Sequence, residues 1–128
     1  MIVIGLLLTG FGALFHIYAF VLESVQWTSA QTRAVFKMTP EQAEYTRGLA
    51  FNQGFYNLFL AVGVVLGTIL LVAGQRTVGA SVVVTCALIM TGAGLVLIAS
   101  DRRRLRVGML QAVPPAVGAA TLLIGLAQ

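Results

Sequence analysis

The chain is poor in charged residues and in the residues that build soluble catalytic or metal sites. Charged residues make up 9% of its 128 residues, whereas soluble domains contain roughly 25%. It has one histidine and one cysteine, which excludes an internal disulfide and the common zinc-binding spacings. It also lacks a phosphate-binding loop, a redox cysteine pair and the nucleophile elbow of serine hydrolases. We therefore expect neither a metal site nor a cofactor.

Apolar residues dominate instead. They make up 59% of the chain, and the mean hydropathy is +0.95. A soluble domain of 13.5 kDa leaves too much of its surface exposed to hide them. Four apolar runs each supply close to the roughly 20 residues that a bilayer-spanning helix requires. The sequence predicts an all-α integral membrane protein, a four-helix bundle formed by one domain over residues 1–128, with helices at about 2–22, 40–73, 78–99 and 107–126.

Basic residues lie almost entirely on one side of these helices. Seven of the eight follow the first or the third helix: Arg33, Lys37, Arg47, Arg102, Arg103, Arg104 and Arg106. Only Arg76 lies on the opposite side. Because basic loops stay in the cytoplasm, the 24–49 and 101–106 loops are predicted to be cytoplasmic and both termini to lie outside. This placement assigns the basic charge to topology and anionic lipid headgroups, and we expect no nucleic-acid partner.

The first basic loop contains signals for helix starts. Thr39-Pro40-Glu41-Gln42 combines an N-cap hydroxyl, a proline at the first helical position and glutamine at the third. The second long helix is therefore predicted to begin near Pro40 in the cytoplasm and to run unbroken into the membrane. Thr28-Ser29-Ala30-Gln31 predicts a short cytoplasmic helix that reaches about Lys37 and lies along the membrane surface. Trp27 stands where an interfacial aromatic anchor is expected.

Small residues and prolines mark expected helix contacts. Gly63 and Gly67 form a GxxxG motif, which permits close backbone approach between membrane helices. Pro114 and Pro115 remove two backbone donors from the fourth helix, which frees two carbonyls and favours a bend. We interpret the glycines as packing positions, whereas the prolines fit either a packing kink or carbonyls that line a site.

Polar residues within the apolar helices gather toward the cytoplasmic side. Such residues are rare in membrane helices, and an ionisable or polar group there is a functional-site hypothesis. The candidate site residues are His16, Glu23, Asn52, Gln53, Tyr56, Asn57 and Gln111. A single histidine and a single glutamate, with a remote cysteine, fall short of the three or four ligands of a metal site.

Helix geometry predicts that these residues form one pocket. His16 and Glu23 share a helix face because they are seven residues apart, which is about 10.5 Å of rise. The pairs Asn52/Tyr56 and Gln53/Asn57 form one polar stripe at i,i+4 spacing. Depth counting places Asn57 and Gln111 level with His16, and Glu23 near Asn52 and Arg47. We therefore expect His16, Tyr56, Asn57 and Gln111 to face one another and to be bridged directly, by water or by a ligand.

The residues leave three functions open. The first is a binding or transport site for a small or lipophilic molecule in the cytoplasmic leaflet. The second is an accessory subunit that docks on a larger membrane complex or forms a homo-oligomer. The third is an intramembrane enzyme that uses His16 with Tyr56 or Glu23. Each polar residue alone is also explained as glue between helices.

The chain resembles a known family in several short motifs. They are His16-x-Tyr18, Glu23, Trp27, the string Asn52-Gln53-Gly54-x-Tyr56-Asn57, and Gln111-x-x-Pro114. On these residues, over essentially its whole length, the chain resembles the bacterial four-helix membrane proteins known as domain of unknown function 1304. The resemblance implies the same fold and a bacterial cytoplasmic (inner) membrane location. It implies no particular chemistry.

Overall fold

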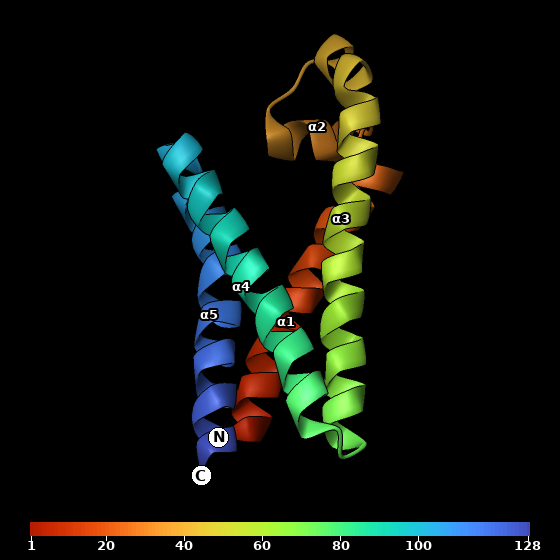
Figure 1. The fold of residues 1–128 in the computed structure, drawn as a ribbon. Helices are drawn as coiled ribbons and strands as arrows, with labels where there is room; N and C mark the ends of the chain where they lie inside the picture. Colours follow the sequence, from red (N-terminus) through yellow and green to blue (C-terminus); the bar gives the residue numbers. More distant parts are fainter.

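The computed structural model describes all 128 residues and contains helices but no strand. The elements are α1 (Ile2–Phe20), the π-helical turn η1 (Val21–Val25), α2 (Ala30–Phe36), α3 (Pro40–Val72), α4 (Arg76–Ser100), the 3₁₀ turn η2 (Arg102–Arg104) and α5 (Leu105–Ala127) (Figure 1). Four segments are long and apolar enough to cross a membrane: Ile2–Val25, Pro40–Val72, Arg76–Ser100 and Arg102–Ala127. The predicted all-α class is confirmed, and the four segments indicate a helical membrane protein.

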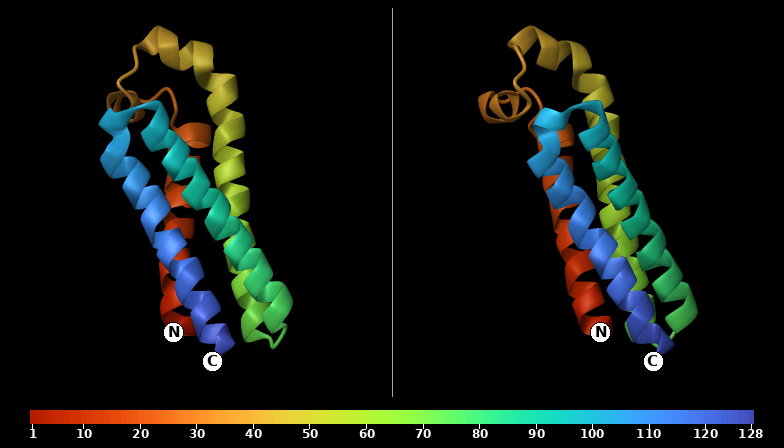
Figure 2. Two further views of the ribbon diagram at one scale, coloured as in Figure 1. Left: turned by 60° about the vertical axis from the view of Figure 1, so that its left-hand side comes forward. Right: turned by 90° about the vertical axis from the view of Figure 1, so that its left-hand side faces the viewer.

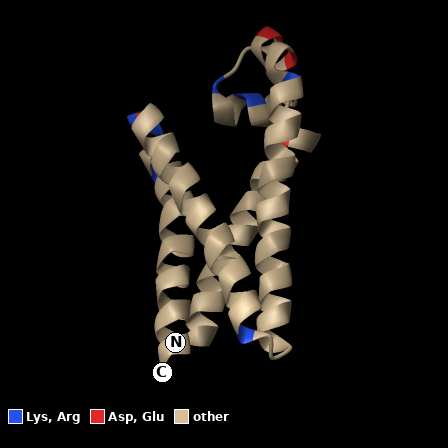
Figure 3. Cartoon of the chain, in the orientation of Figure 1, with Lys and Arg blue, Asp and Glu red and all other residues tan.

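Each long helix packs against two of the others. α1 contacts α3 and α5, and α4 contacts the same two helices, whereas α1 and α4 make little contact with each other. Both termini lie beside the α3–α4 turn, while α2 and the α4–α5 connection lie at the opposite end (Figures 1 and 2). Charged residues gather at that opposite end, apart from a basic residue where α4 begins (Figure 3). We call the two ends the termini end and the basic end.

The apolar core lies in the middle and toward the termini end. One cluster joins Ala13, Ala61, Val64 and Met90, and the other joins Leu71, Ala80, Val83 and Leu122. α3 and α4 meet near their connecting turn and diverge toward the basic end (Figures 1 and 2). The basic end is consequently held by other kinds of contact.

Close backbone approach accounts for the packing of α4 on α3. A methyl group at Gly79 would meet the Leu71 nitrogen and lie 2.6 Å from the Gly67 carbonyl oxygen. A methyl group at Gly67 would lie 2.9 Å from both the Val83 nitrogen and the Gly79 carbonyl oxygen. Only glycine fits at either position without moving a backbone. Gly67 of the GxxxG motif is therefore a packing residue, as predicted.

The start of α3 is the predicted capping box. The Thr39 hydroxyl accepts a hydrogen bond from the Gln42 amide at 3.2 Å, and the Gln42 side chain accepts one from the Thr39 amide at 2.9 Å. The helix then continues without a break from Pro40 to Val72. At about 1.5 Å per residue, 33 residues give roughly 50 Å, which exceeds the apolar thickness of a bilayer. α3 is therefore longer than a membrane span requires, as the predicted cytoplasmic extension needs.

The short helix α2 forms, but its cap differs from the prediction by one residue. Ser29 is the N-cap and accepts from the Thr32 amide at 3.2 Å, whereas the motif had placed the cap at Thr28. A second hydroxyl contact, from Ser29 to Thr32 at 3.0 Å, favours this register. The helix ends at Phe36, and Lys37, which caps it, is in the left-handed conformation with φ of 55°.

Trp27 joins the first basic loop to two helices. Its indole N–H donates to the Thr46 hydroxyl on α3 at 3.1 Å. Its ring packs on Phe36 of α2, with ring centroids 4.9 Å apart. Trp27 therefore fixes α2 against the extended part of α3, in addition to its predicted place at the interface.

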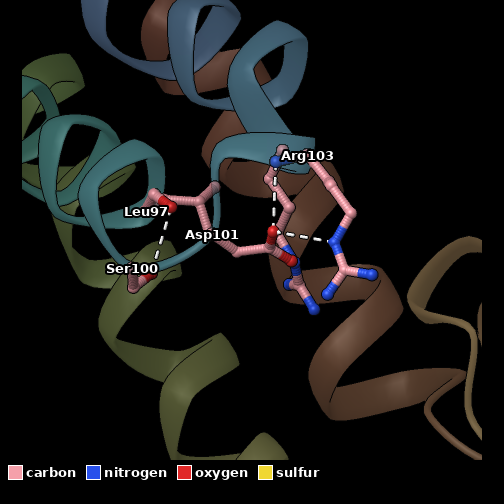
Figure 4. A network of polar contacts seen from close by, with 5 residues as sticks. Leu97, Ser100, Asp101 and Arg103 are labelled. Carbon is pink, nitrogen blue, oxygen red and sulfur yellow. Dashed lines mark hydrogen bonds and ion pairs between the residues drawn. The ribbon is translucent and has the colours of Figure 1, made fainter.

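Asp101 organises the other basic connection (Figure 4). Its carboxylate accepts from the Arg103 backbone N–H at 3.0 Å and from Arg103 Nε at 3.2 Å, and it pairs with Arg104 at 3.5 Å. The backbone bond, followed by the side-chain bond and the charges of these arginines, holds the pKa of Asp101 below its usual range. The carboxylate caps η2 and thereby starts the turn into α5.

Candidate functional site

The main departure from the sequence prediction is the π-helical turn at the end of α1. The Gln26 amide bonds to the Val21 carbonyl at 2.9 Å, five residues back, and the first helix reaches Val25 instead of ending near Leu22. A π turn holds more residues than an α turn, so side chains beyond it are rotated relative to those before it. Glu23 lies inside this turn and does not follow the regular face that begins at His16.

The π turn packs directly on α3 through a small joint. The Ser24 hydroxyl donates to the Phe51 carbonyl at 2.8 Å. A methyl group at Gly54 would collide with the Ser24 hydroxyl and lie 3.1 Å from the Glu23 Cβ. Glycine at position 54 is therefore required for this approach. The central glycine of the Asn-Gln-Gly-x-Tyr-Asn string thus has a packing role that the string alone did not reveal.

Glu23 and Asn57 complete the joint. The Asn57 amide nitrogen donates to the Glu23 carboxylate at 2.7 Å. Asn57 is 8% exposed, and Glu23 is half-buried. The bond places Asn57 level with Glu23, whereas depth counting had placed it level with His16, roughly 10 Å further along α1. The register differs from the count because the π turn carries the first helix past Leu22 and because Gly54 packs directly against Ser24.

A pocket opens beside this joint at the basic end. Its volume is about 490 Å³, and its lining residues are Glu23, Ser24, Val25, Trp27, Thr28, Glu44, Arg47, Gly48 and Phe51. We call it the Glu23 pocket. Arg47 pairs with Glu44 at 3.6 Å and makes no ion pair with Glu23. Glu23 and Arg47 were predicted to lie close together. They line the same pocket but do not form an ion pair.

His16 is fully buried and only half satisfied. Its Nδ1 lies 2.9 Å from the Gly12 carbonyl oxygen. Because a carbonyl oxygen only accepts, Nδ1 carries the proton in this bond. Nε2 is buried and has no hydrogen-bond partner. His16 makes no direct hydrogen bond to Tyr56, Asn57 or Gln111, which was one of the three predicted ways of bridging them.

The helix register brings Gln111 opposite His16. A methyl group at Gly12 would touch Pro115 at 3.4 Å, so these positions face each other across α1 and α5. α1 and α5 run antiparallel. Moving four residues forward from Gly12 and four residues back from Pro115 therefore brings His16 and Gln111 to the same level of the bundle. Gln111 is half-buried there. Pro115 is fully buried, and α5 passes through both prolines without interruption.

Three candidates lie outside the helix packing. Asn52 and Gln53 are exposed, and Tyr56 is 65% exposed. None of the three makes a side-chain hydrogen bond, and the expectation that Tyr56 faces His16 is wrong. They lie toward the basic end of α3, where α4 diverges from it (Figure 1). A common helix stripe was not enough to bury them because no neighbouring helix covers that part of the stripe.

The structure also identifies residues that the sequence reasoning missed. Ser24, Glu44 and Gly48 line the Glu23 pocket or hold the joint. These residues come together because of the π turn and the long start of α3 at the basic end, and no local sequence motif predicts their contacts. No group of three His, Cys, Asp or Glu side chains is close enough to hold a metal ion.

A second space of the same size lies at the termini end. This groove of about 490 Å³ between α4 and α5 is lined by Arg76, Thr77, Ala80, Ser81, Val84, Thr85, Leu123 and Leu126. We call it the Arg76 groove. It contains hydroxyls and one cation but no carboxylate, so the two spaces differ in charge.

Comparisons with known proteins place the chain in a family. Residues 10–123 match a family described as "Protein of unknown function (DUF1304)". No curated protein and no solved structure matches the chain. The matched segment includes every candidate site residue and the whole η1–α3 joint. The chain therefore belongs to the DUF1304 family.

Proposed function

We propose that this protein binds, and in that way carries or presents, a small amphiphilic molecule at the Glu23 pocket in the cytoplasmic leaflet. The observation that supports this function is a half-buried carboxylate, oriented by Asn57, on the wall of a ligand-sized pocket. Ligand pockets are commonly about 300–1,000 Å³, and placed polar groups in them fix the orientation of the ligand. A carboxylate with no bound cation is costly away from water, and a ligand offsets that cost.

Identification of molecules that co-purify with the protein tests this proposal. The protein is extracted from native membranes in a mild detergent, and its bound molecules are identified by mass spectrometry. We expect about one molecule of one chemical class per chain, because the space suits one ligand. Glu23→Gln should lose it while keeping an oxygen for Asn57, and Asn52→Ala should retain it. An empty wild-type protein, or equal retention by both variants, contradicts the proposal.

The outer face of α3 supports a second candidate function, docking as an accessory subunit. Two amides and a phenol are exposed there without partners, and polar groups on membrane helices commonly bond to another helix. A photo-crosslinking residue at position 56 should capture one defined partner, or a second copy of this chain. The same residue at position 95, where Leu95 is 56% exposed, is the control. Equal, diffuse crosslinking at both positions counts against docking.

We also propose that the protein resides in a bacterial cytoplasmic membrane with its basic end inside. The support is the gathering of seven of the eight basic residues at that end, which is the usual cytoplasmic bias. In a variant whose Cys86 is replaced, a new cysteine at position 75 should react with an impermeant reagent on intact cells. One at position 104 should not. The reverse pattern contradicts this orientation.

A further inference from the structure

We infer that the Glu23 pocket recognises an organic ammonium group, such as the head of an amine-bearing amphiphile. This inference rests on the proposed function and names the chemical class of its ligand. Three features of the pocket carry it: the charge balance of the wall, the orientation of the carboxylate, and the aromatic residues beside it.

The charge balance leaves one negative charge unpaired. The lining contains two carboxylates, Glu23 and Glu44, and one cation, Arg47. Arg47 already pairs with Glu44 at 3.6 Å. Arg33 on α2 bonds to the Thr28 carbonyl at 3.2 Å and is not part of the lining. Glu23 therefore faces the pocket without a cation, and a positively charged guest supplies one.

The Glu23 carboxylate is held in place before any guest arrives. Its Oε2 accepts from Asn57 at 2.7 Å, and the backbone behind it is fixed by the Ser24–Phe51 bond at 2.8 Å. A donor that is fixed to α3 limits the rotation of the carboxylate. Preorganisation of this kind reduces the entropy lost on binding.

Aromatic residues complete the recognition chemistry. Trp27 and Phe51 both line the pocket. The indole position is fixed by its bond to Thr46 and its contact with Phe36. Aromatic faces attract ammonium groups, and tryptophan does so most strongly. A carboxylate with aromatic side chains favours an organic cation over a phosphate or a neutral sugar, since neither gains from the unpaired negative charge.

Trp27 provides a direct readout, because it is the only tryptophan in the chain. The protein is purified in dodecyl maltoside, which contains no ammonium group and no tryptophan. Trp27 fluorescence is titrated with choline and, separately, with 3,3-dimethylbutan-1-ol, which has the same shape without the charge. We expect choline to bind about tenfold more tightly or better, since ion pairing and cation–π attraction favour it.

Variants assign this preference to the carboxylate. Glu23→Gln should bring the two affinities together, and Glu23→Asp should partly restore the preference for choline. Glu44→Gln should also weaken choline binding, because it releases Arg47 beside the pocket. Asn52→Ala lies outside the lining and should behave like the wild type. If Glu23→Gln fails to fold, the Glu44→Gln and Glu23→Asp titrations carry the test.

The outcomes separate this inference from the proposed function. Equal binding of both probes, or binding of the neutral probe alone, overturns the ammonium inference while leaving a ligand pocket. Unchanged choline preference in Glu23→Gln also overturns it, because another group would then be responsible. No response to either probe, together with no co-purified molecule, overturns both.

Discussion

The packing of α3 on its neighbours differs between the two ends of the molecule, because side-chain hydrogen bonds join the glycine contact only at the basic end. At the termini end, glycines let α3 and α4 touch through their backbones, and a methyl group at Gly79 would lie 2.6 Å from the Gly67 carbonyl oxygen. At the basic end, a few directional bonds join η1 to α3: Asn57 to Glu23 at 2.7 Å and Ser24 to Phe51 at 2.8 Å. Neither apolar cluster reaches that joint.

The two spaces of equal size differ in chemistry as well. Dispersion contacts depend on shape and use no polar side chain, and the hydroxyls and the cation of the Arg76 groove take no part in the glycine contact. Directional bonds need polar groups, and these groups line the Glu23 pocket once the joint is made. The same residues therefore hold the basic end together and give it binding chemistry.

The largest expected effect comes from breaking the glycine contact. Gly79→Val should destabilise the protein by on the order of 1–3 kcal/mol, because the added carbons meet the backbone of α3 and no rotamer avoids them. The measurement is the thermal unfolding midpoint in detergent. Gly92→Val on the same helix is the control, since nothing lies within 4 Å of a methyl group there. Equal destabilisation by both changes would mean that helix propensity, not contact, limits stability.

A smaller loss is expected at the polar joint. Asn57→Ala removes the donor to the half-buried Glu23 carboxylate and should cost about 1–2 kcal/mol. Hydrogen exchange at residues 21–29 should rise while exchange at the termini end stays unchanged. Asn52→Ala is the matched control because its side chain is exposed and makes no hydrogen bond. A uniform rise along the whole chain would show that the two ends are not separable.

The hydrogen bond from Trp27 to Thr46 should contribute still less to stability. Trp27→Phe keeps an aromatic ring against Phe36 but loses the N–H bond to Thr46, for an expected cost of about 0.5–1 kcal/mol. Hydrogen exchange of α2 is the measurement. Thr46→Ser keeps the acceptor and should leave exchange near the wild-type rate. If Thr46→Ser matches Trp27→Phe, the methyl group of Thr46 matters more than the bond.

The smallest effect concerns the Asp101 cap. Its pKa lies below the usual aspartate range, so the cap contributes at neutral pH and is lost as the pH falls through that lowered pKa. The Arg103 amide resonance should titrate with a midpoint below that of an unperturbed aspartate. Asp101→Asn should remove this titration without changing the global unfolding midpoint. A midpoint at or above the ordinary value would show that the carboxylate does not cap η2.

Much of the fold was readable from the sequence because its determinants are local. The capping box at Thr39 needs only four residues, and the apolar runs need only length and composition. The site was less accessible because its determinants are contacts between helices. Gln53 and Asn57 share a stripe, yet only Asn57 is buried, since the π turn covers that position and nothing covers Gln53. The π turn itself has no local signature.

The contact between the first and last helices has a consequence for assembly. α5 is synthesised after α1, so the face of α1 that it covers has no partner until α5 is made. That face carries Thr9 and His16, and both bond to carbonyls of their own helix: Thr9 to Gly5 at 3.0 Å and His16 to Gly12 at 2.9 Å. These bonds within the helix satisfy the Thr9 hydroxyl and the His16 Nδ1 before α5 is in place. α1 can therefore remain stable as a single helix until α5 packs against it and completes the four-helix arrangement.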